Sequence, residues 1–325
     1  MTSLQHILIN QWYQPKPWGW LLWPCSKLFE VFVKLRVALY QKGILRSYKA
    51  QVPVIIVGNL TVGGTGKTPL VMALAELLRQ QGLHPGIVLR GYKSNAVGAI
   101  IVQTNMDPKL VGDEALLLAK RCACPVVVAK KRVAGVKKLI QACAVNVILC
   151  DDGLQHYALQ RDLEIAVIDG ERGFGNGRSL PMGPLRELPQ RLQKVNLTVT
   201  NGADMHLTCA KMYSLLNNKR TMPITDLAGK TVHAIAGIGT PKKFFKLLSD
   251  QGLTVIPHEF PDHHKFSMSD LVFPDRLPIL MTEKDAVKCG YFASDRYWVV
   301  PVDTVLSDNV KEQFTNLVQG VLYGR

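Results

Sequence analysis

The stretch "NLTVGGTGKTPL", residues 59–70, follows an apolar run and precedes a helical pattern. Its end, Gly66-Lys67-Thr68, fits the phosphate-binding pattern G-x-x-x-x-G-K-[ST], but Thr61 stands where that pattern has its first glycine. Glycines let backbone N–H groups surround phosphates, the lysine reaches the β- and γ-oxygens, and the hydroxyl reaches Mg²⁺. We therefore predict a nucleotide-binding loop despite the missing glycine. The residues expected to hold the nucleotide are Thr61, Val62, Gly63, Gly64, Thr65, Gly66, Lys67 and Thr68.

The segments around this loop alternate between strand and helix patterns. Residues 52–59 form a short apolar run rich in β-branched residues, which is typical of a buried strand, and residues 69–82 predict a helix that stops at a glycine. The alternation favours an α/β fold of the P-loop type, with a mostly parallel sheet and helices on both faces. We predict an N-terminal segment (1–48), a P-loop core (49–200) and a smaller α/β unit (201–325).

A P-loop needs an acidic partner for Mg²⁺ at the end of a nearby strand. The apolar run "VNVILC" ends in Asp151 and Asp152, and two adjacent carboxylates are costly unless a cation neutralises them. Asp169, which follows "IAVI", is a rival for the same role. We favour the pair, and the sequence therefore predicts a Mg²⁺ site formed by Thr68, Asp151 and Asp152.

The choice of nucleotide depends on a second motif. Guanine-specific P-loop proteins carry N-K-x-D late in the fold, and the nearest candidate, "TEKD" at 282–285, has the wrong spacing. ATP is therefore favoured over GTP. A P-loop GTPase switch or metallochaperone stays as the alternative, and a peripheral membrane scaffold with a vestigial nucleotide site is a third possibility.

The composition is strongly basic, with a formal net charge of +14 over 325 residues. This charge favours an anionic partner such as a nucleic acid, an acidic membrane surface or a phosphorylated substrate, although a basic soluble protein without such a partner also fits. The seven cysteines contain no C-x-x-C pair, so neither a zinc site nor a disulfide framework is expected, and reducing cytosol is the default compartment. We find no secretory signal and expect no membrane-spanning helix.

The N-terminal segment combines aromatic and basic residues. Three of the five tryptophans lie within residues 18–23, and Pro24 marks a boundary before a predicted helix over residues 26–40. Lysines and large apolar side chains fall on opposite sides of this helix, with Arg36 interrupting the apolar side. The apolar side either packs on the body of the protein or lies in a membrane interface, with the tryptophans at the headgroups. The tryptophans and the basic residues that follow favour the membrane.

Other polar stretches offer candidates for chemistry. Asp113, at a predicted helix start, is either a cap that accepts backbone hydrogen bonds or a base that takes a hydroxyl proton. The Asp-His-His sequence at 262–264 is either a metal cluster or a histidine paired with a distant carboxylate. Arg178 and Arg186 lie in a loop rich in glycine and proline, which suits either the binding of an anion or a solvated turn.

Taken together, seven motifs resemble those of the tetraacyldisaccharide 4'-kinases, the lipid A 4'-kinases of Gram-negative bacteria. They occur in the family's order, and the resemblance runs from the tryptophan-rich N-terminus to the end of the sequence. The family also carries threonine in place of the first P-loop glycine, which accounts for Thr61. The motifs are "GNLTVGGTGKTP", "RGYK", "GDEA", "DDGLQH", "GNGRSLPMGPLRE", "FPDHHKF" and "TEKDAVK".

The resemblance implies ATP-dependent phosphorylation of the 4'-hydroxyl of a tetraacylated glucosamine disaccharide 1-phosphate, giving lipid IV-A, with ATP and Mg²⁺ bound. It implies catalytic roles for Lys67 and Asp152, a role for Asp113 as base, and for His263 rather than His264 as the partner of that base. The remaining matched positions are assigned to the substrate: Arg90, Tyr92, Gln155, His156, Arg178 and Arg186.

The resemblance also implies where in the cell the protein acts. Acyl chains leave a bilayer at a cost of about 0.8 kcal/mol per CH₂, so the enzyme has to act at the membrane. We expect a monomeric, peripheral protein on the cytoplasmic face of the inner membrane. Its expected partners are the lipid A disaccharide precursor and the anionic membrane surface, and no nucleic acid. Because His263 belongs to the second predicted unit, we also expect a hinge that closes over ATP.

Overall fold

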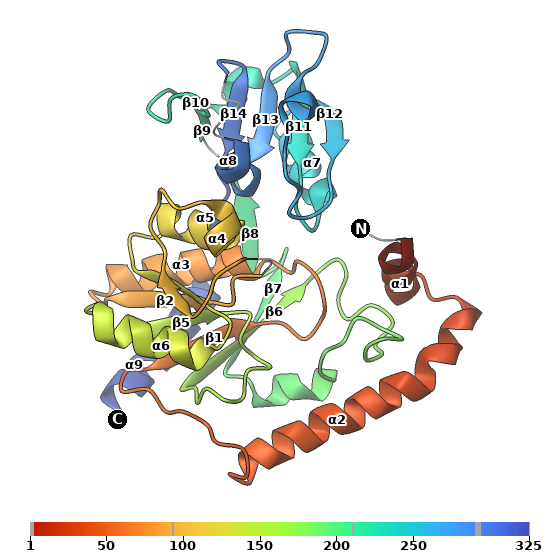
Figure 1. Ribbon diagram of the computed structural model, residues 1–325. Helices are drawn as coiled ribbons and strands as arrows, with labels where there is room; N and C mark the ends of the chain where they lie inside the picture. The colour runs from red at the N-terminus through yellow and green to blue at the C-terminus, as the bar shows by residue number, and fades with distance from the viewer. Residues whose placement is uncertain (1–2, 93, 210, 290–293, 325) are drawn as a thin grey trace.

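The described residues form two β-sheets, one in each of the two bodies seen in Figure 1. The computed structural model describes residues 3–92, 94–209, 211–289 and 294–324, so Lys93, the last residue of "RGYK", lies outside the described residues. We call the part built on the larger sheet the first lobe and the part built on the smaller sheet the second lobe. In spatial order the larger sheet contains β15 (Asp303–Leu306), β8 (Met205–Thr208), β7 (Leu197–Asn201), β6 (Leu163–Asp169), β1 (Val54–Gly58), β5 (Val147–Asp151), β2 (Pro85–Leu89), β4 (Val126–Ala129) and β3 (Ala99–Ile101).

The strand before the predicted nucleotide loop lies in the middle of the first lobe. β1 runs parallel to β5 and β6, with Val57 opposite Asp151 on one side and Ile165 on the other. All five residues of β1 are buried, as expected for a parallel strand covered on both faces. Val57 belongs to the core that contains α3 (Lys67–Gln80), α5 (Asp113–Arg121) and α9 (Asp308–Tyr323), and Ile56 to the core that contains α6 (Arg132–Ala142).

The second lobe repeats the strand and helix alternation on a smaller scale. Its sheet contains, in spatial order, β10 (Thr221–Pro223), β9 (Lys211–Ser214), β14 (Tyr297–Val300), β13 (Ile279–Thr282), β11 (Thr231–Ala236) and β12 (Thr254–Glu259). The helix α7 (Pro241–Asp250) packs on β11 and β12, and α8 (Glu283–Cys289) follows β13 and packs against α5 of the first lobe. Short helices complete the lobes: α4 (Pro108–Val111), η2 (Pro189–Lys194), η3 (Ile224–Leu227) and η4 (Met268–Leu271).

The predicted α/β class is confirmed as a mixed fold with large, mostly parallel sheets. Among the described residues, the antiparallel pairs of the larger sheet are β15 with β8 and β3 with β4. Those of the smaller sheet are β9 with β10 and with β14. The parallel pairs place the carboxyl ends of neighbouring strands along one edge of each sheet, which is where ligands of such folds bind.

The chain returns to the first lobe at its end. β8 joins the larger sheet before the chain enters the second lobe, and β15 comes back to pair with it. Phe314 of α9 is fully buried in the first-lobe core. Residues 205–208 and 303–323 therefore lie with the larger sheet, which differs from the predicted unit of residues 201–325. Pairing between strands so far apart in the sequence leaves no local pattern from which the return could be predicted.

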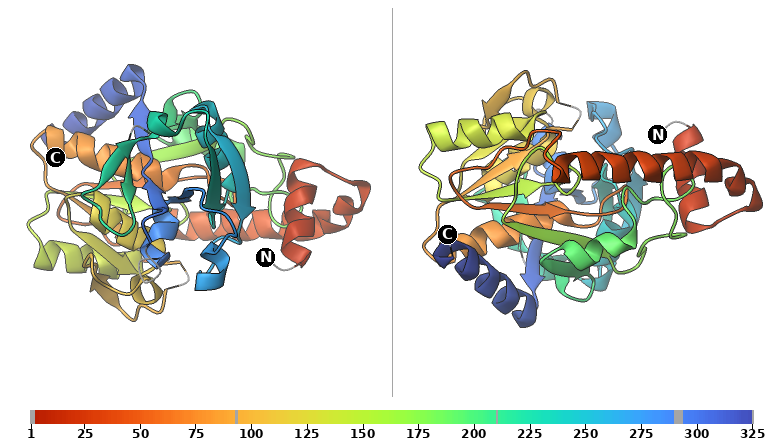
Figure 2. Two further views of the ribbon diagram at one scale, coloured as in Figure 1. Left: turned by 90° about the horizontal axis from the view of Figure 1, so that it is seen from above. Right: turned by 90° about the horizontal axis from the view of Figure 1, so that it is seen from below.

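The N-terminal segment lies on the outside of the first lobe. It consists of α1 (Ser3–Tyr13), η1 (Pro17–Leu22) and α2 (Trp23–Gln41), and Figure 2 shows α2 running across that lobe and projecting beyond it. The helix predicted over residues 26–40 starts earlier, and Pro24 lies in its first turn instead of preceding it. Proline is tolerated there because the first N–H groups of a helix have no intrahelical acceptor. In the part of the chain that the structure describes, no helix is long and apolar enough to cross a membrane.

Candidate active site

The predicted nucleotide loop joins the carboxyl end of β1 to the amino end of α3. Gly63 and Gly66 have φ values of 116° and 97°, in the left-handed region that favours glycine. A side chain at Gly66 would also collide with Met205 and Asn201. Asn201, at the end of β7, donates from Nδ2 to the carbonyl of Thr65 at 3.2 Å. The backbone thus requires the glycines, and Asn201 supports the loop through a contact that sequence analysis missed.

Thr61 occupies the first glycine position of the pattern without a left-handed backbone. It forms an antiparallel bridge with Leu185, and the N–H of Val62 donates to the carbonyl of Pro184 at 2.8 Å. The Thr61 side chain is buried. A bridged, extended backbone suits a β-branched residue and does not need glycine. The departure from the usual pattern is therefore explained by the loop of residues 173–187, which lies against the nucleotide loop.

Lys67 and Thr68 lie beside the acidic pair at the end of β5. Thr68 Oγ1 donates to Asp151 Oδ2 at 3.1 Å, and Lys67 Nζ lies 3.6 Å from Asp152 Oδ1. Lys67 also donates to the side-chain oxygen of Asn59 at 3.1 Å. The end of the loop and the two carboxylates thus form one polar cluster at the carboxyl edge of the larger sheet.

The two aspartates have different electrostatic environments. Asp151 is 4% exposed, and its Oδ1 has no hydrogen-bond partner among the described residues. Burial, followed by the nearby carboxylate of Glu114, raises the pKa of Asp151 to about 6. Asp152 has a φ of 50° and accepts a hydrogen bond from Arg186 Nη1 at 2.9 Å. Although burial opposes it, the charges of Lys67 and Arg186 lower the pKa of Asp152. Asp151 is therefore the carboxylate with an oxygen left for a cation.

A buried arginine supports both aspartates. Arg132 begins α6, and its Nη2 donates to the backbone carbonyls of Asp151 at 2.6 Å and Asp152 at 2.7 Å. These bonds hold the strand end at which Asp152 takes its positive φ. Sequence analysis missed this residue because Arg132 directly follows two lysines and looks like part of a basic surface run.

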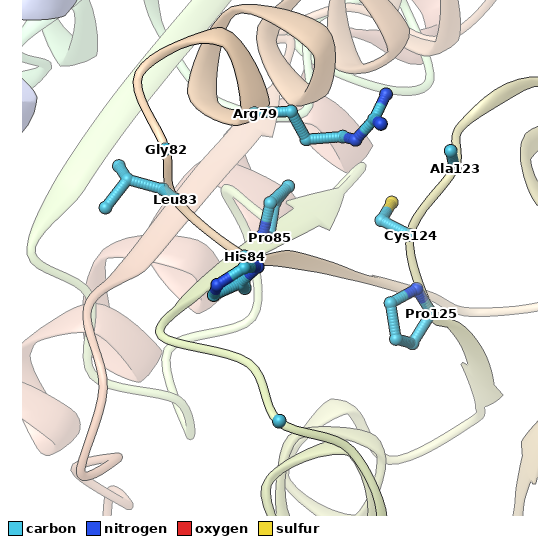
Figure 3. Close-up of a pocket in the computed structure, with 9 residues that line it drawn as sticks. Arg79, Gly82, Leu83, His84, Pro85, Ala123, Cys124 and Pro125 are labelled. Atoms are coloured by element: carbon cyan, nitrogen blue, oxygen red, sulfur yellow. The ribbon is translucent and has the colours of Figure 1, made fainter.

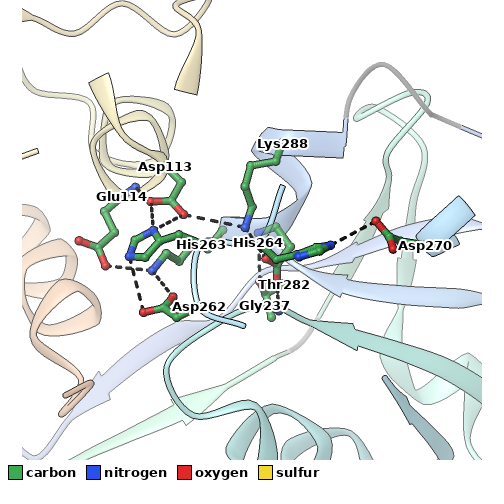
Figure 4. Close-up of polar contacts among 11 residues, drawn as sticks. Asp113, Glu114, Gly237, Asp262, His263, His264, Asp270, Thr282 and Lys288 are labelled. Atoms are coloured by element: carbon green, nitrogen blue, oxygen red, sulfur yellow. Dashed lines mark hydrogen bonds and ion pairs between the residues drawn. The ribbon is translucent and has the colours of Figure 1, made fainter. Parts of the chain in front are cut away.

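A hydrogen bond between the lobes joins Asp113 to His263, as Figure 4 shows. His263 Nδ1 lies 3.0 and 2.9 Å from the two carboxylate oxygens of Asp113. Asp113 begins α5 in the first lobe, whereas His263 follows β12 in the second lobe and has a φ of 63°. Although burial opposes it, the hydrogen bond from His263 and the charge of Lys284 lower the pKa of Asp113. The contact therefore holds an ionised carboxylate against an imidazole.

The geometry bears on two alternatives that the sequence left open. Gly112 is the N-cap residue of α5, and Asp113 Oδ1 accepts a hydrogen bond from the backbone N–H of Glu114 at 2.9 Å. His264 does not reach Asp113, because its Nε2 lies 3.2 Å from Asp270 Oδ2 within the second lobe. The described residues contain no group of three or more His, Cys, Asp or Glu side chains arranged to hold a metal ion, so the Asp-His-His sequence forms no such cluster there.

Two lysines of α8, Lys284 and Lys288, add positive charge to the contact between the lobes, and Figure 4 labels Lys288. Lys284 Nζ donates to Glu114 Oε1 and Asp262 Oδ1, both at 3.1 Å. Lys288 Nζ lies 3.9 Å from Asp113 Oδ2. The "TEKD" sequence therefore supplies a contact between the lobes. The contact could not be predicted from the sequence, because Glu114 lies 170 positions away from Lys284 in the chain.

Several residues assigned to the substrate surround these clusters. The ring of Tyr92 lies 5.5 Å from the ring of His263, between centroids, and Arg90 is exposed nearby in sequence. By contrast, the guanidinium of Arg178 lies 5.4 Å from the ring of Trp20, so this arginine lies beside the N-terminal segment. Tyr92 thus adjoins the Asp113 contact, whereas Arg178 adjoins the N-terminal segment.

Gln155 and His156 follow the acidic pair closely in the sequence. Gln155 Nε2 donates to the carbonyl of Asn59 at 3.2 Å, and its Oε1 accepts a hydrogen bond from Arg186 at 3.4 Å. Burial, followed by the nearby charge of Arg132, lowers the pKa of His156 to about 4. His156 is therefore neutral at physiological pH and offers an uncharged hydrogen-bonding ring.

Asp169, the rival of the acidic pair, has other partners. It ends β6, and Lys243 of the second lobe donates to both of its carboxylate oxygens at 3.1 and 3.0 Å. The backbone N–H of Glu171 donates to Asp169 as well, at 3.1 Å. The hydroxyl and lysine of the nucleotide loop thus reach Asp151 and Asp152, while Asp169 takes part in a second contact between the lobes.

A pocket at the opposite edge of the larger sheet contains none of the predicted site residues (Figure 3). Its lining includes Arg79, His84 and Cys124, and it lies where β2 and β4 begin. Ligands of open α/β sheets bind outside the carboxyl ends of the strands. The polar clusters around Lys67 and Asp113 lie at those ends and form the candidate active site.

Known proteins similar to this chain share one description. The family model of tetraacyldisaccharide-1-P 4'-kinase matches residues 18–319. A tetraacyldisaccharide 4'-kinase of Nitrosococcus oceani is 47% identical over 98% of this chain and 96% of its own length. One of Methylobacillus flagellatus is 43% identical over 98% of both chains.

A solved structure agrees with these relatives. The crystal structure of the "apo" form of LpxK from Aquifex aeolicus in complex with ATP superimposes with a TM-score of 0.79. It is 29% identical in sequence and covers 92% of this chain and 99% of its own. Since the family model and the curated relatives both span nearly the whole sequence, this chain belongs to the tetraacyldisaccharide-1-P 4'-kinase family.

Proposed function

We propose that this chain transfers the γ-phosphoryl group of ATP to the 4'-hydroxyl of a tetraacylated glucosamine disaccharide 1-phosphate, giving lipid IV-A in lipid A biosynthesis. Family membership and the ATP complex of the Aquifex aeolicus protein support the acceptor and the donor. The observation that carries the proposal is the Asp113–His263 contact on one side of a glycine-rich loop that ends in Lys67.

The proposed chemistry follows from the charges at this site. Asp113 accepts the proton of the attacking hydroxyl as the new oxygen–phosphorus bond forms and ADP leaves. His263 donates from Nδ1 to Asp113 and orients its carboxylate. The ammonium of Lys67 offsets the negative charge of the transferring phosphoryl group. Arg186 holds Asp152 beside Lys67, which fixes the position of that charge.

The residues at the end of β5 fit a Mg²⁺ ion. Mg²⁺ takes few protein ligands, keeps several waters and prefers carboxylate and phosphate oxygens. Asp151 has a buried oxygen without a hydrogen-bond partner among the described residues, and Thr68 already lies against its other oxygen. We propose that Asp151 and Thr68, with Asp152 beside them, would hold the ion. Bound there, Mg²⁺ would neutralise phosphate charge during the transfer.

The outer surface of the N-terminal segment fits a membrane interface. Ser26 Oγ donates to the carbonyl of Ser179 at 2.9 Å and accepts from the N–H of Met182 at 3.0 Å, so the side of α2 that carries Ser26 faces the first lobe. The apolar side is uncovered, with Leu28 72% and Phe32 63% exposed. Exposed apolar side chains gathered on one helix mark an interaction surface.

We propose that residues 1–48 are a peripheral membrane-interface segment of a protein on the cytoplasmic face of the inner membrane. Its lysines and arginines would then contact anionic headgroups, while the acyl chains of the acceptor stay in the bilayer. Residues 49–200 would form the P-loop core, completed by β8, β15 and α9, and the rest of residues 201–325 would contribute the second lobe that closes over ATP. We propose a monomer, because Asp113 and His263 of one chain already meet.

The reaction can be tested by transfer of labelled γ-phosphate from ATP to tetraacyl disaccharide 1-phosphate in mixed micelles, with and without Mg²⁺. We expect Mg²⁺-dependent labelling of the lipid. Lys67→Met should lower kcat/KM by about 100-fold or more, because it removes a fixed positive charge from the transfer site. Lys138→Met, on the exposed side of α6, is the control. Near-normal turnover in Lys67→Met would show that the loop does not hold the transferred phosphate.

The proposed base can be tested with Asp113→Asn, His263→Gln and the double variant. We expect each single change to lower kcat by about 10²- to 10⁴-fold while leaving the Kd for ATP within about twofold. Because the two residues act as one unit, the double variant should be no slower than the slower single variant. Losses that multiply, or an equal loss of ATP binding, would assign the pair a structural role.

The membrane segment can be tested by sedimentation with anionic phosphatidylglycerol vesicles. Burying one large apolar side chain contributes about 1.5 kcal/mol or more, so Leu21→Ser, Leu28→Ser and Phe32→Ser should each weaken binding by about tenfold. Leu216→Ser, an equally exposed change in the second lobe, should have no effect. Unchanged binding in the three variants would place the membrane contact elsewhere.

The neutral state of His156 predicts a pH effect on stability. An unfolded histidine titrates near pH 6.5, whereas the folded pKa is about 4. The unfolded state therefore binds more protons between these values, and stability is lost as pH falls through this window. We expect His156→Gln to show a shallower fall of the urea midpoint from pH 7 to 4.5 than the wild type. His84→Gln, at an exposed site, is the control, and equal slopes for His156→Gln and wild type would contradict the assignment.

A further inference from the structure

A second contact between the lobes lies on the side of the nucleotide loop away from Asp113. Lys243 in the first turn of α7 donates to Asp169 Oδ1 at 3.1 Å and Oδ2 at 3.0 Å. Asp169 ends β6, next to β1 in the larger sheet. Figure 1 shows α7 above β6 and β7 in that view, so the ion pair bridges the space between the two bodies.

The two charges of this pair depend on each other. Asp169 is 2% exposed, and a buried carboxylate is costly unless a cation and hydrogen-bond donors surround it. The backbone N–H groups of Glu171 and Arg172 are donors from its own loop, and Lys243 supplies the charge from the other lobe. A lysine in the first turn of a helix is opposed by the helix dipole. The position of Lys243 is therefore explained by Asp169 and not by the preferences of α7.

The element that Lys243 holds lies against the nucleotide loop. A side chain built on Gly64 would come within 3.8 Å of Thr240 Oγ1, and one built on Gly239 within 3.8 Å of the backbone nitrogen of Gly64. Thr240 is the N-cap residue of α7, three positions before Lys243. The ion pair thus fixes the segment of the second lobe that covers the loop expected to hold the phosphates.

We propose that the Lys243–Asp169 ion pair is a clamp that keeps the second lobe closed over the nucleotide loop, which makes Lys243 a positioning residue for ATP binding. This inference rests on the proposed function, because it assigns the loop to ATP. The clamp and the Asp113–His263 contact lie on opposite sides of the loop, because β6 and the α5-bearing β4 lie on opposite sides of β1 in the sheet. Both contacts are made at the same time when the lobes are closed. When the clamp is lost, a smaller fraction of molecules is closed, and the apparent Kd for ATP rises in inverse proportion to that fraction.

The clamp predicts a specific pattern among lysine variants. Lys243→Met should raise the Kd for ATP with Mg²⁺, measured by calorimetry, by about tenfold, and should raise KM for ATP while lowering kcat less. Lys243→Arg should restore most of the affinity because it keeps the charge. Lys242→Met is the matched control, since Lys242 is exposed on the same turn of α7. An unchanged Kd and kcat in Lys243→Met, or an equal effect of Lys242→Met, would overturn the clamp.

A second measurement separates the clamp from the proposed reaction. Small-angle X-ray scattering should give a larger radius of gyration for Lys243→Met than for wild type, and Asp169→Asn should produce the same increase. The double variant should be no more open than either single variant, because both remove one interaction. A wild type that binds ATP but labels no lipid would refute the proposed function. The Kd for ATP and the radius of gyration of the variants would still show whether the ion pair keeps the lobes closed. Identical scattering by all variants would refute the clamp alone.

Discussion

The hydrogen bond between Asp113 and His263 is the interaction on which the candidate site depends, because it joins residues from two separate sheets. Neither lobe contains both partners, so the chemistry that they offer exists only when the lobes meet. The contact also places the carboxylate among the lysines of α8, and the hydrogen bond from His263 together with the lysine charges lowers the pKa of Asp113 despite its burial. The charges that surround Asp113 therefore come together only when the two lobes are in contact.

Three aspartates of the first lobe, Asp151, Asp152 and Asp169, lie near the loop between β1 and α3. Each buried carboxylate near this loop has cationic or backbone partners, except that one oxygen of Asp151 has no hydrogen-bond partner among the described residues. Asp152 and Asp169 are held by arginine and lysine side chains, and each therefore has a fixed position before any ligand binds. This preorganisation leaves Asp151 as the carboxylate suited to a cation, which is the arrangement that transfer of a phosphoryl group needs.

The loop of residues 173–187 links the outer surface to the site. One part of it both donates and accepts hydrogen bonds with α2, and another part bridges Thr61 and supplies Arg186 to Asp152. The helix proposed to contact the membrane and the loop proposed to hold ATP are thus both hydrogen-bonded to the loop of residues 173–187. Under the proposed function, this connection would give an acceptor anchored in a bilayer a fixed position relative to the phosphate donor.

The sequence by itself determined the elements whose signals are local. The buried run of β1, the glycine-rich turn and the helix after it are contiguous, and the resemblance of seven ordered motifs pointed to the family that the comparisons then showed. Only the tertiary structure decided which distant residues meet. Arg132 reaches the aspartates from a basic run, Lys243 reaches Asp169 from the other lobe, and α9 returns to the first lobe. The physical reason is that such contacts depend on how whole sheets and helices pack, whereas a periodic pattern reports only the neighbours along one element.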